Sequence, residues 1–358
     1  MKKGFFSEKI VGWYGEHCRD LPWRNTQEPY KIWLSEIILQ QTRVIQGLPY
    51  YKKFIQHFPN INSLARAKEE EVLRLWQGLG YYTRARNLHK CARVVVKKFN
   101  GKFPPRFKDL KTLPGIGDYT AAAIASFAFH EPVAVVDGNV YRVLSRVFGI
   151  DREISSGEGK RTFFELANQL ISKKEPGLFN QAIMEFGALQ CLPKNPKCDE
   201  CIFKKNCYAY QHDQQNLFPV KRKAKKITRR HFYYFFIRRG KKILMTLRAK
   251  NDIWQGLYDF PLLEAGRSKS YRRIVKDMLQ EAGVTRSPSS NNLISKGYKH
   301  QLTHQLIHAH FVRMHWPQGI KLPAGPMFVN AKWYSPKQIA QLPKPVLISR
   351  YLEDEVIL

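Results

Sequence analysis

The feature that most constrains the fold of this chain is a change in its hydrophobic pattern after residue 210. Before that point, apolar residues recur at three- and four-residue spacing, which predicts short helices separated by proline and glycine. After it, runs such as HFYYFFIRR (231–239) and HAHFVRMHW (308–316) have the aromatic-rich pattern of strands. We therefore expect an all-α domain over residues 1–212 and a smaller α+β domain over residues 231–358, with one helix at 271–282.

The segment between these domains, residues 213–230, is expected to be a basic linker, because 221–230 (KRKAKKITRR) contains seven lysines and arginines. The whole chain has 60 Lys and Arg against 29 Asp and Glu, which gives a net charge of +31. Such like charge repels itself in the folded state, and its usual explanation is a polyanionic partner. Nucleic acid is therefore the expected partner, and an anionic lipid surface is the alternative.

A membrane-bound or secreted protein is not expected. No apolar run approaches the roughly 20 residues of a membrane-spanning helix. Ser7, Glu8 and Lys9 interrupt the apolar core that a signal peptide requires. We expect a monomeric cytoplasmic protein that is associated with the nucleoid and has no membrane partner.

Four of the six cysteines lie close together in the sequence, at Cys191, Cys198, Cys201 and Cys207. Disulfide frameworks are mainly a feature of small secreted domains, so this cluster indicates a metal site instead. Its spacing contains a single CxxC, whereas structural zinc sites usually pair two. Four thiolates can also hold an iron–sulfur cluster. The spacing alone leaves zinc and iron–sulfur open.

A short glycine motif, LPGIGDYT (113–120), precedes a helix of small residues. Gly115 and Gly117 allow a tight hairpin in which backbone N–H groups point outward at the start of the next helix. Such N–H groups can bind a DNA phosphate without reading the base sequence. A GxG pattern is often only a turn, but the basic composition of this chain favours a role in DNA binding.

Two carboxylates stand in apolar surroundings, where a charge is costly unless it has a purpose. Asp137 follows the apolar run 133–136 and can either cap the next helix or take part in chemistry. Glu36 lies in the predicted helix YKIWLSEIILQQT (30–42), on a face that it shares with apolar side chains. Burial there would raise its pKa, as a general acid requires. A structural ion pair is the alternative for Glu36.

Together these motifs resemble the helix-hairpin-helix superfamily of base-excision DNA glycosylases. The strings SEIILQQT (35–42), GLGYYTRARNL (78–88) and FNQAIMEFGALQC (179–191) are similar to the MutY-type adenine DNA glycosylases in particular. This resemblance covers nearly the whole chain. It implies removal of adenine mispaired with 8-oxoguanine or guanine in double-stranded DNA, from a base flipped out of the stack. It also implies a [4Fe-4S] cluster on the four clustered cysteines.

The resemblance also implies roles for single residues. Glu36 matches the family's catalytic acid, and Asp137 matches the carboxylate that stabilises the oxocarbenium-like sugar, as in glycoside hydrolysis. Tyr119 and Asn139 match residues that support the sugar and Asp137. The adenine pocket is matched by Arg19, Trp23, Leu39 and Gln181, and the residues beside 8-oxoguanine are matched by Gln41 and Tyr81.

The residue at position 119 distinguishes two related enzyme types. Glycosylases that also cut the strand as β-lyases have a lysine there, which forms a Schiff base. Because this chain has Tyr119, we expect a monofunctional enzyme that leaves an abasic site. The alternatives are an endonuclease-III-like glycosylase/lyase, which Tyr119 and the second domain disfavour, and a non-catalytic DNA-binding protein with a structural metal. The pair of Glu36 and Asp137 disfavours the latter.

The C-terminal domain resembles the Nudix-like domain of MutY-type proteins. The stretch 276–284 matches the metal-binding box of Nudix hydrolases but keeps only Glu281 of the expected glutamates. A divalent cation needs more negative charge, so nucleotide hydrolysis is not expected. The resemblance implies 8-oxoguanine recognition by Thr303 and His304. Leu302 stands where the family has phenylalanine, so the stacking that an aromatic ring provides is not expected at this position.

Overall fold

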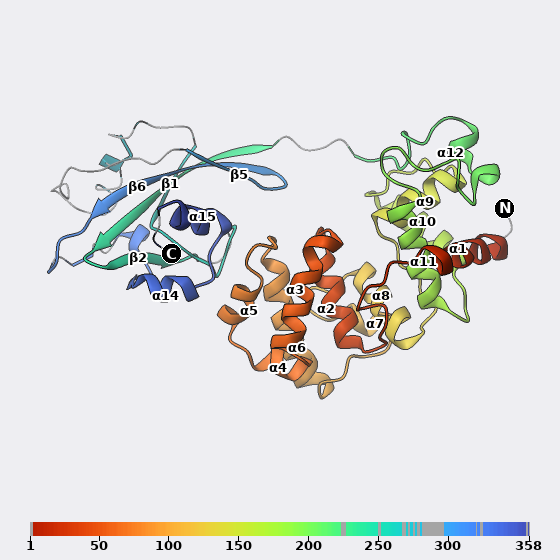
Figure 1. The fold of residues 1–358 in the computed structure, drawn as a ribbon, viewed down its shortest axis with the longest axis horizontal. Helices are drawn as coiled ribbons and strands as arrows, with labels where there is room; N and C mark the ends of the chain where they lie inside the picture. Colours follow the sequence, from red (N-terminus) through yellow and green to blue (C-terminus); the bar gives the residue numbers. More distant parts are fainter. Residues whose placement is uncertain are drawn as a thin grey trace. The chain divides into compact units, whose positions relative to one another are not determined.

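The computed structural model describes residues 3–222, 227–249, 252–266, 270, 273–274, 276–277, 280, 297–319, 321–322, 325–355 and 357. The chain forms two compact units (Figure 1), which are described separately. The first comprises Met1–Arg66 and Asn87–Lys223, and the second comprises Ala67–Arg86 and Ala224–Leu358. In the described ranges, none of the helices has the length and hydrophobicity that crossing a bilayer requires.

The first unit is built from helices joined by short loops, and no strand occurs among its described residues. The α6 helix begins in the second unit and enters the first unit at Asn87. The helices are α1 (Lys3–His17), α2 (Pro29–Leu39), α3 (Val44–His57), α4 (Ile61–Arg66), α6 (Thr83–Phe99), α7 (Phe107–Leu110), α8 (Asp118–Phe129), α9 (Gly138–Phe148), α10 (Gly157–Leu170), α11 (Pro176–Leu189) and α12 (Tyr208–Gln211). The expected all-α organisation is confirmed.

Two packing arrangements hold the first unit together. Apolar side chains of α1, α9, α10 and α11 form one core, in which Phe163, Phe179, Phe186 and Phe203 are buried. Burial of such rings is a main source of folding free energy. The α8 helix carries small side chains, and Ala121 and Ala125 are completely buried where α2 packs against it. This packing brings Glu36 on α2 close to Tyr119 on α8.

The connection from α7 to α8 forms the predicted hairpin. Gly115 has φ +76°, and a Cβ atom at this position would lie 2.7 Å from Cβ of Asn87. Both the backbone conformation and the space therefore require glycine here. Gly117 is the N-cap of α8, and no side chain caps that helix.

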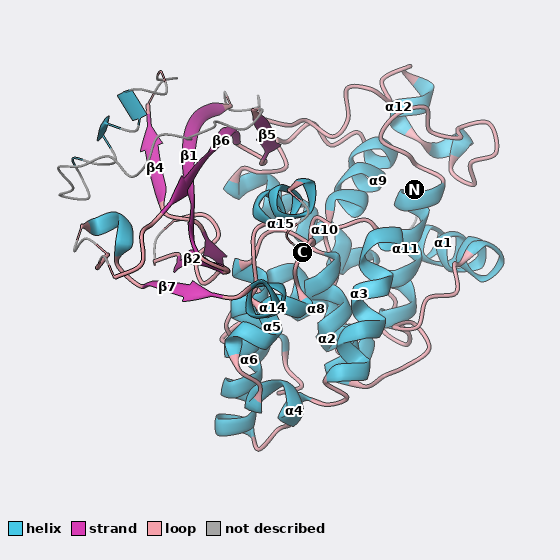
Figure 2. Cartoon of the chain, turned by 60° about the vertical axis from the view of Figure 1, so that its left-hand side comes forward, coloured by secondary structure: helices cyan, strands magenta, loops and turns pink. Residues whose placement is uncertain are grey.

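Among the described residues, the second unit contains a seven-stranded mixed sheet with helices, as the expected α+β class requires. Its central strands β1 (Thr228–Arg239) and β6 (Gln305–His315) run parallel, side by side in Figure 2. The other strands are β2 (Lys242–Leu247), β3 (Tyr258–Asp259), β4 (Leu262–Ala265), β5 (Tyr298–Gln301) and β7 (Ala331–Tyr334), with α14 (Pro336–Gln341) and α15 (Val346–Asp354). The strand order is β3-β2-β1-β6-β5, and β4 also pairs with β1 and β7 with β2. In the core, Tyr351 of α15 stacks on Phe311 at 3.8 Å between ring centroids.

Residues 67–86, which include α5 (Glu69–Leu75), form part of the second unit rather than the first. The hydroxyl of Tyr258 donates a hydrogen bond to Glu70 at 2.8 Å. The side-chain amide of Gln77 donates to Ser349 at 3.0 Å. The sequence pattern assigns this segment to the first domain from its local helical periodicity, and the domain bounds given there stay a prediction.

Residues 213–222 lie against the first unit. Arg146 donates to the carbonyl of Gln215 at 2.9 Å, and the N–H of Ile154 donates to the carbonyl of Val220 at 3.1 Å. These described residues of the expected linker therefore belong to the first unit. The expected helix at 271–282 and the stretch 276–284 with Glu281 lie largely outside the described residues.

Candidate active site

Most of the site residues predicted in the first unit line one cavity of about 470 Å³. This volume is within the usual range for small-molecule sites. Its walls come from α2, α8, α9 and α11 and from the loop before α2. The predicted residues that line it are Arg19, Trp23, Glu36, Leu39, Tyr119, Asp137, Asn139 and Gln181.

Glu36 is a buried acid on the cavity wall. Its side chain points from α2 toward α8, and the hydroxyl of Tyr119 donates to its carboxylate at 2.6 Å. Burial raises the pKa of Glu36 to about 7, although the hydrogen bond from Tyr119 acts in the opposite direction and nearby Asp137 adds to the rise. Burial, together with the charge of Glu36, also raises the pKa of Tyr119, so its phenol stays protonated as a donor. Glu36 can therefore hold a proton near neutral pH.

Asp137 is the N-cap of α9. Its carboxylate accepts hydrogen bonds from the backbone N–H groups of Asn139 and Val140, both at 2.8 Å, and from the side-chain amide of Asn139 at 2.8 Å. Burial raises the pKa of Asp137, whereas these hydrogen bonds stabilise the ionised form and act to lower the pKa. The capping role is thus present, and Asp137 still lines the cavity.

Asn139 is itself held in place by an arginine. Arg142 donates to the side-chain oxygen of Asn139 at 2.8 Å and to the backbone carbonyl of Cys191 at 2.7 Å. Asn139 therefore presents its amide to Asp137 in a fixed orientation. The sequence pattern did not identify Arg142, which also lines the cavity.

Sequence reasoning also missed Arg24 and Glu185, which form a cluster with the predicted Arg19. The Glu185 side chain, 1% exposed, pairs with Arg19 at 2.5 Å and with Arg24 at 2.7 Å. Burial alone would raise the pKa of Glu185, but the hydrogen bonds from Arg19 and then Arg24 lower it to about 2. Glu185 lies four residues after Gln181 on α11, and this same-face spacing could have identified it.

The remaining residues of this cavity supply apolar and amide surface. Trp23 is buried and packs edge-on against Tyr51, with 5.1 Å between ring centroids. The side-chain oxygen of Gln181 accepts a hydrogen bond from the hydroxyl of Tyr14 at 2.9 Å. Gln41, just beyond α2, has φ +55°, is exposed, and is not part of the cavity lining.

Three other predicted residues meet in the second unit. Tyr81, Thr303 and His304 line a cavity of about 840 Å³, together with Leu302 and Trp254. The hydroxyls of Tyr81 and Thr303 are hydrogen-bonded to each other. Tyr81 has φ +49° and is 47% exposed, so a strained backbone presents its ring to solvent.

The hairpin joins α8 at Gly117, where no side chain of the described residues caps the helix. Because no side chain caps α8, its first N–H groups are available to an anion. Lys111 and Asp118 form an ion pair beside Gly117. The binding of an anion at Gly115 and Gly117 stays a prediction.

The four clustered cysteines surround one small cavity together with Arg146. Arg146 donates to the sulfur of Cys191 at 3.4 Å, and the N–H of Phe203 donates to the sulfur of Cys201 at 3.4 Å. Four thiols with a cation and N–H donors beside them fit a group that is held by thiolates. Within the described ranges, no three His, Cys, Asp or Glu side chains are grouped so that they could hold a metal ion.

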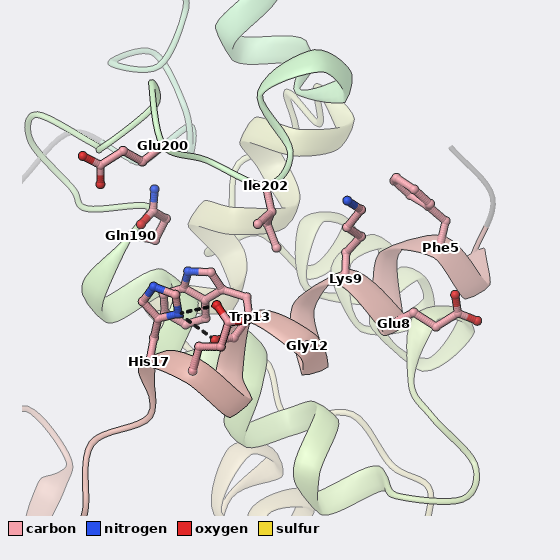
Figure 3. Close-up of a pocket in the computed structure, with 10 residues that line it drawn as sticks. Phe5, Glu8, Lys9, Gly12, Trp13, His17, Gln190, Glu200 and Ile202 are labelled. Atoms are coloured by element: carbon pink, nitrogen blue, oxygen red, sulfur yellow. Dashed lines mark hydrogen bonds and ion pairs between the residues drawn. The ribbon is translucent and has the colours of Figure 1, made fainter.

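A further hollow of about 660 Å³ runs along α1 and the cysteine loop (Figure 3). Its lining includes Trp13 and His17, whose rings stack at 4.7 Å, and Glu200 from the loop. None of the site residues named individually in the sequence analysis lines this hollow.

Known proteins share these features. The chain matches the HhH-GPD superfamily of base excision DNA repair proteins over residues 34–169 and the NUDIX domain over residues 233–354. In solved structures, a thermostable thymine-DNA glycosylase superposes with a TM-score of 0.54 at 31% identity, covering 59% of this chain and 97% of that one. An endonuclease III–DNA complex gives a TM-score of 0.52 at 20% identity, covering 60% and 99%, and shows the shared fold alone.

Relatives in sequence extend over both units. The adenine DNA glycosylase of Buchnera aphidicola subsp. Schizaphis graminum is 35% identical over 350 residues, covering 95% of this chain and 96% of that protein. The adenine DNA glycosylase of Mus musculus is 44% identical over 219 residues, covering 59% of this chain and 42% of that protein. With its helical unit, its Nudix-type unit and these relatives, the chain belongs to the adenine DNA glycosylase family.

Proposed function

We propose that this protein hydrolyses the N-glycosidic bond of adenine paired with 8-oxoguanine or guanine in double-stranded DNA and leaves an abasic site. The observation that carries this proposal is that the buried side chain of Glu36 and the carboxylate of Asp137 line the same cavity. Family membership supports adenine as the base. The glycosidic bond is inaccessible inside the stack, so the adenine must be flipped into the cavity.

Glu36 is the proposed general acid. Adenine leaves poorly until its imidazole ring is protonated, and a carboxyl group with a pKa of about 7 can supply that proton near neutral pH. Tyr119 holds the carboxyl in place through its 2.6 Å hydrogen bond. After the base departs, the Glu36 carboxylate can accept a proton from the attacking water.

Asp137 is the proposed stabiliser of the sugar. Loss of adenine leaves positive charge on the sugar ring, and a fixed carboxylate stabilises it strongly in a cavity with little water. The hydrogen bonds from Asn139 and Val140 keep Asp137 oriented and favour its ionised form.

The adenine ring would lie between Trp23 and Leu39, which supply apolar contacts, and Gln181, which supplies an amide. An amide can meet the donor–acceptor pair on an adenine edge. Arg19 is paired with Glu185, so its proposed contribution is to shape and charge the wall of the pocket.

The enzyme is proposed to be monofunctional because Tyr119 has no amine that could form an imine with the sugar. Its phenol instead donates to Glu36. Attempted trapping of an enzyme–DNA adduct with borohydride should therefore give none, and efficient trapping would contradict this part of the proposal.

Recognition of 8-oxoguanine is assigned to Gln41, Tyr81, Thr303 and His304. The hydrogen bond between the hydroxyls of Tyr81 and Thr303 supports a joint role for these two residues. Leu302 cannot stack as an aromatic ring would, so hydrogen bonding by Thr303 and His304 carries the contact in this chain. Gly115 and Gly117 are proposed to bind a DNA phosphate through backbone N–H groups.

The four cysteines are proposed to hold a [4Fe-4S] cluster, which would fasten the loop 191–207 to the first unit. The N–H donors to Cys191 and Cys201 support thiolate ligands. Cys191, Cys198, Cys201 and Cys207 would each supply one thiolate ligand to such a cluster. Protein purified without oxygen should contain iron and acid-labile sulfide, and stoichiometric zinc without iron would contradict this assignment.

A gel assay with end-labelled duplexes tests the proposed function. Duplexes with adenine opposite 8-oxoguanine, guanine or thymine are incubated with the protein, and each sample is divided for treatment with or without hot alkali. We expect cleavage at adenine only after alkali, and only opposite 8-oxoguanine or guanine. Intact adenine in all duplexes, or cleavage without alkali, would overturn the proposal.

A further inference from the structure

Behind the proposed adenine pocket lies a tyrosine that does not line it. Tyr14 is on the buried face of α1, which packs against α11. Its hydroxyl donates to the side-chain oxygen of Gln181 at 2.9 Å. Gln181 lines the cavity whereas Tyr14 does not. The hydroxyl of Tyr14 therefore contacts the pocket lining through the Gln181 amide.

The ring of Tyr14 is held on its other side by the arginine–glutamate cluster. The guanidinium of Arg24 lies 5.5 Å from the ring centroid, and Arg24 is itself bonded to Glu185 at 2.7 Å. The ring is 7% exposed. Its hydroxyl is thus held in a fixed position relative to Gln181.

This hydrogen bond determines which way the Gln181 amide faces. If the amide turned half a revolution about its last bond, its NH₂ group would face Tyr14. The hydroxyl hydrogen of Tyr14 would then have no acceptor, because in the described part of the chain its acceptor is Gln181. Leaving a buried donor without a partner is unfavourable. The amide NH₂ group makes no side-chain hydrogen bond within the described residues, so it is available to a ligand.

We infer that Tyr14 is a positioning residue for base specificity, which fixes the Gln181 amide in the orientation that suits adenine. This inference rests on the proposed function. The fixed amide presents an oxygen that can accept from the N6 amino group and a nitrogen that can donate to the neighbouring ring nitrogen. Because the proposed Glu36 proton goes to the imidazole ring, the amide would meet N6 and N1.

Hypoxanthine distinguishes a fixed amide from a free one. It carries an acceptor oxygen where adenine has the N6 amino group, so the fixed amide oxygen would face another oxygen. An amide that can turn would instead direct its NH₂ group to that oxygen. Loss of the Tyr14 hydroxyl should therefore favour hypoxanthine relative to adenine.

The test is Tyr14→Phe, which keeps the buried ring and removes only the hydroxyl. Single-turnover rates are measured for adenine and for hypoxanthine opposite 8-oxoguanine, together with the duplex Kd. We expect the adenine-to-hypoxanthine rate ratio to fall about threefold to tenfold, the range for one hydrogen bond between uncharged groups, with Kd unchanged. An unchanged ratio, or equal slowing of both substrates, would overturn the inference.

Tyr30→Phe is the matched control. Tyr30 is also buried in the first unit, and its hydroxyl donates to the carbonyl of Phe58 at 2.6 Å, away from the cavity. This variant loses a comparable hydrogen bond, so it reports the general effect of such a loss on stability. Its adenine-to-hypoxanthine ratio should equal that of the unaltered protein, and an equal fall in both variants would overturn the inference.

A double-mutant cycle tests whether Tyr14 acts through Gln181. In a Gln181→Met background, Tyr14→Phe should leave the rate ratio unchanged, and a further fall there would contradict the inference. The two levels of failure are distinct. If the unaltered protein releases no adenine, the proposed function is wrong. If it releases adenine but the adenine-to-hypoxanthine rate ratio is the same in Tyr14→Phe, only the positioning role of Tyr14 is wrong.

Discussion

At the scale of single residues, the proposed reaction requires opposite protonation states of Glu36 and Asp137. Glu36 must be protonated, and Asp137 must be ionised. Both are buried, which raises the pKa of each. The difference between them comes from their hydrogen bonds. Glu36 accepts from the phenol of Tyr119, whereas Asp137 accepts from two backbone N–H groups and one amide. This asymmetry supports neutral Glu36 and ionised Asp137 in the same cavity.

Glu36→Gln should lower the single-turnover rate of adenine release by about 10³–10⁴-fold, because general acid–base residues contribute about 10²–10⁴-fold and Glu36 would serve twice. Binding of the mispaired duplex should change little, since the amide keeps the shape of the side chain. Asp137→Asn should also be inactive, through loss of charge next to the sugar. A Glu36→Gln enzyme with more than about a tenth of the original rate would exclude Glu36 as the acid.

The pH dependence follows from the same two groups. The acid must be protonated, so activity should fall as pH rises through about 7, the pKa of Glu36. Asp137 must be ionised, and its raised pKa means that the loss of activity on acidification begins at a higher pH than for an exposed aspartate. Single-turnover rates across pH give the profile. A rate that keeps rising above pH 8 would contradict the role of Glu36.

At the scale of elements, the α7–α8 hairpin depends on one glycine more than on the other. Gly115→Ala would force a side chain into φ +76° and place Cβ 2.7 Å from Asn87. It should lower the free energy of unfolding by about 1–3 kcal/mol. Gly117→Ala is the control, because nothing lies within 4 Å of its Cβ position. Urea unfolding compares the two variants, and equal stabilities would contradict the strain argument.

The hairpin and the cap at Asp137 could be predicted from sequence because both are local. The glycines of the hairpin and the aspartate before a helix act on backbone only a few residues away. Glu185 was not predicted, since its partners Arg19 and Arg24 lie far away in the sequence. The grouping of residues 67–86 with the second unit rests on contacts between distant segments, such as that of Glu70 with Tyr258, which a local sequence pattern does not contain.

At the scale of the whole molecule, base removal and most of the recognition of 8-oxoguanine are proposed for different units. The residues proposed for chemistry lie in the first unit. Of the residues proposed to recognise 8-oxoguanine, Tyr81, Thr303 and His304 lie in the second unit and Gln41 lies in the first. The segment 67–86 contributes to the second unit although it falls between helices of the first in the sequence. A truncation after the first unit therefore also removes the partners of this segment.

Deleting residues 225–358 should leave adenine release measurable but reduce the preference for 8-oxoguanine over guanine opposite it, because Thr303 and His304 are lost. The truncated protein should also be less stable, since Glu70 and Gln77 lose their hydrogen bonds to Tyr258 and Ser349. Thr303→Val in the full chain separates these effects, because it removes only the hydroxyl that meets Tyr81. Single-turnover rates on both duplexes give the preference. If Thr303→Val and the truncated protein both prefer 8-oxoguanine over guanine as strongly as the full chain does, recognition of 8-oxoguanine does not lie in the second unit.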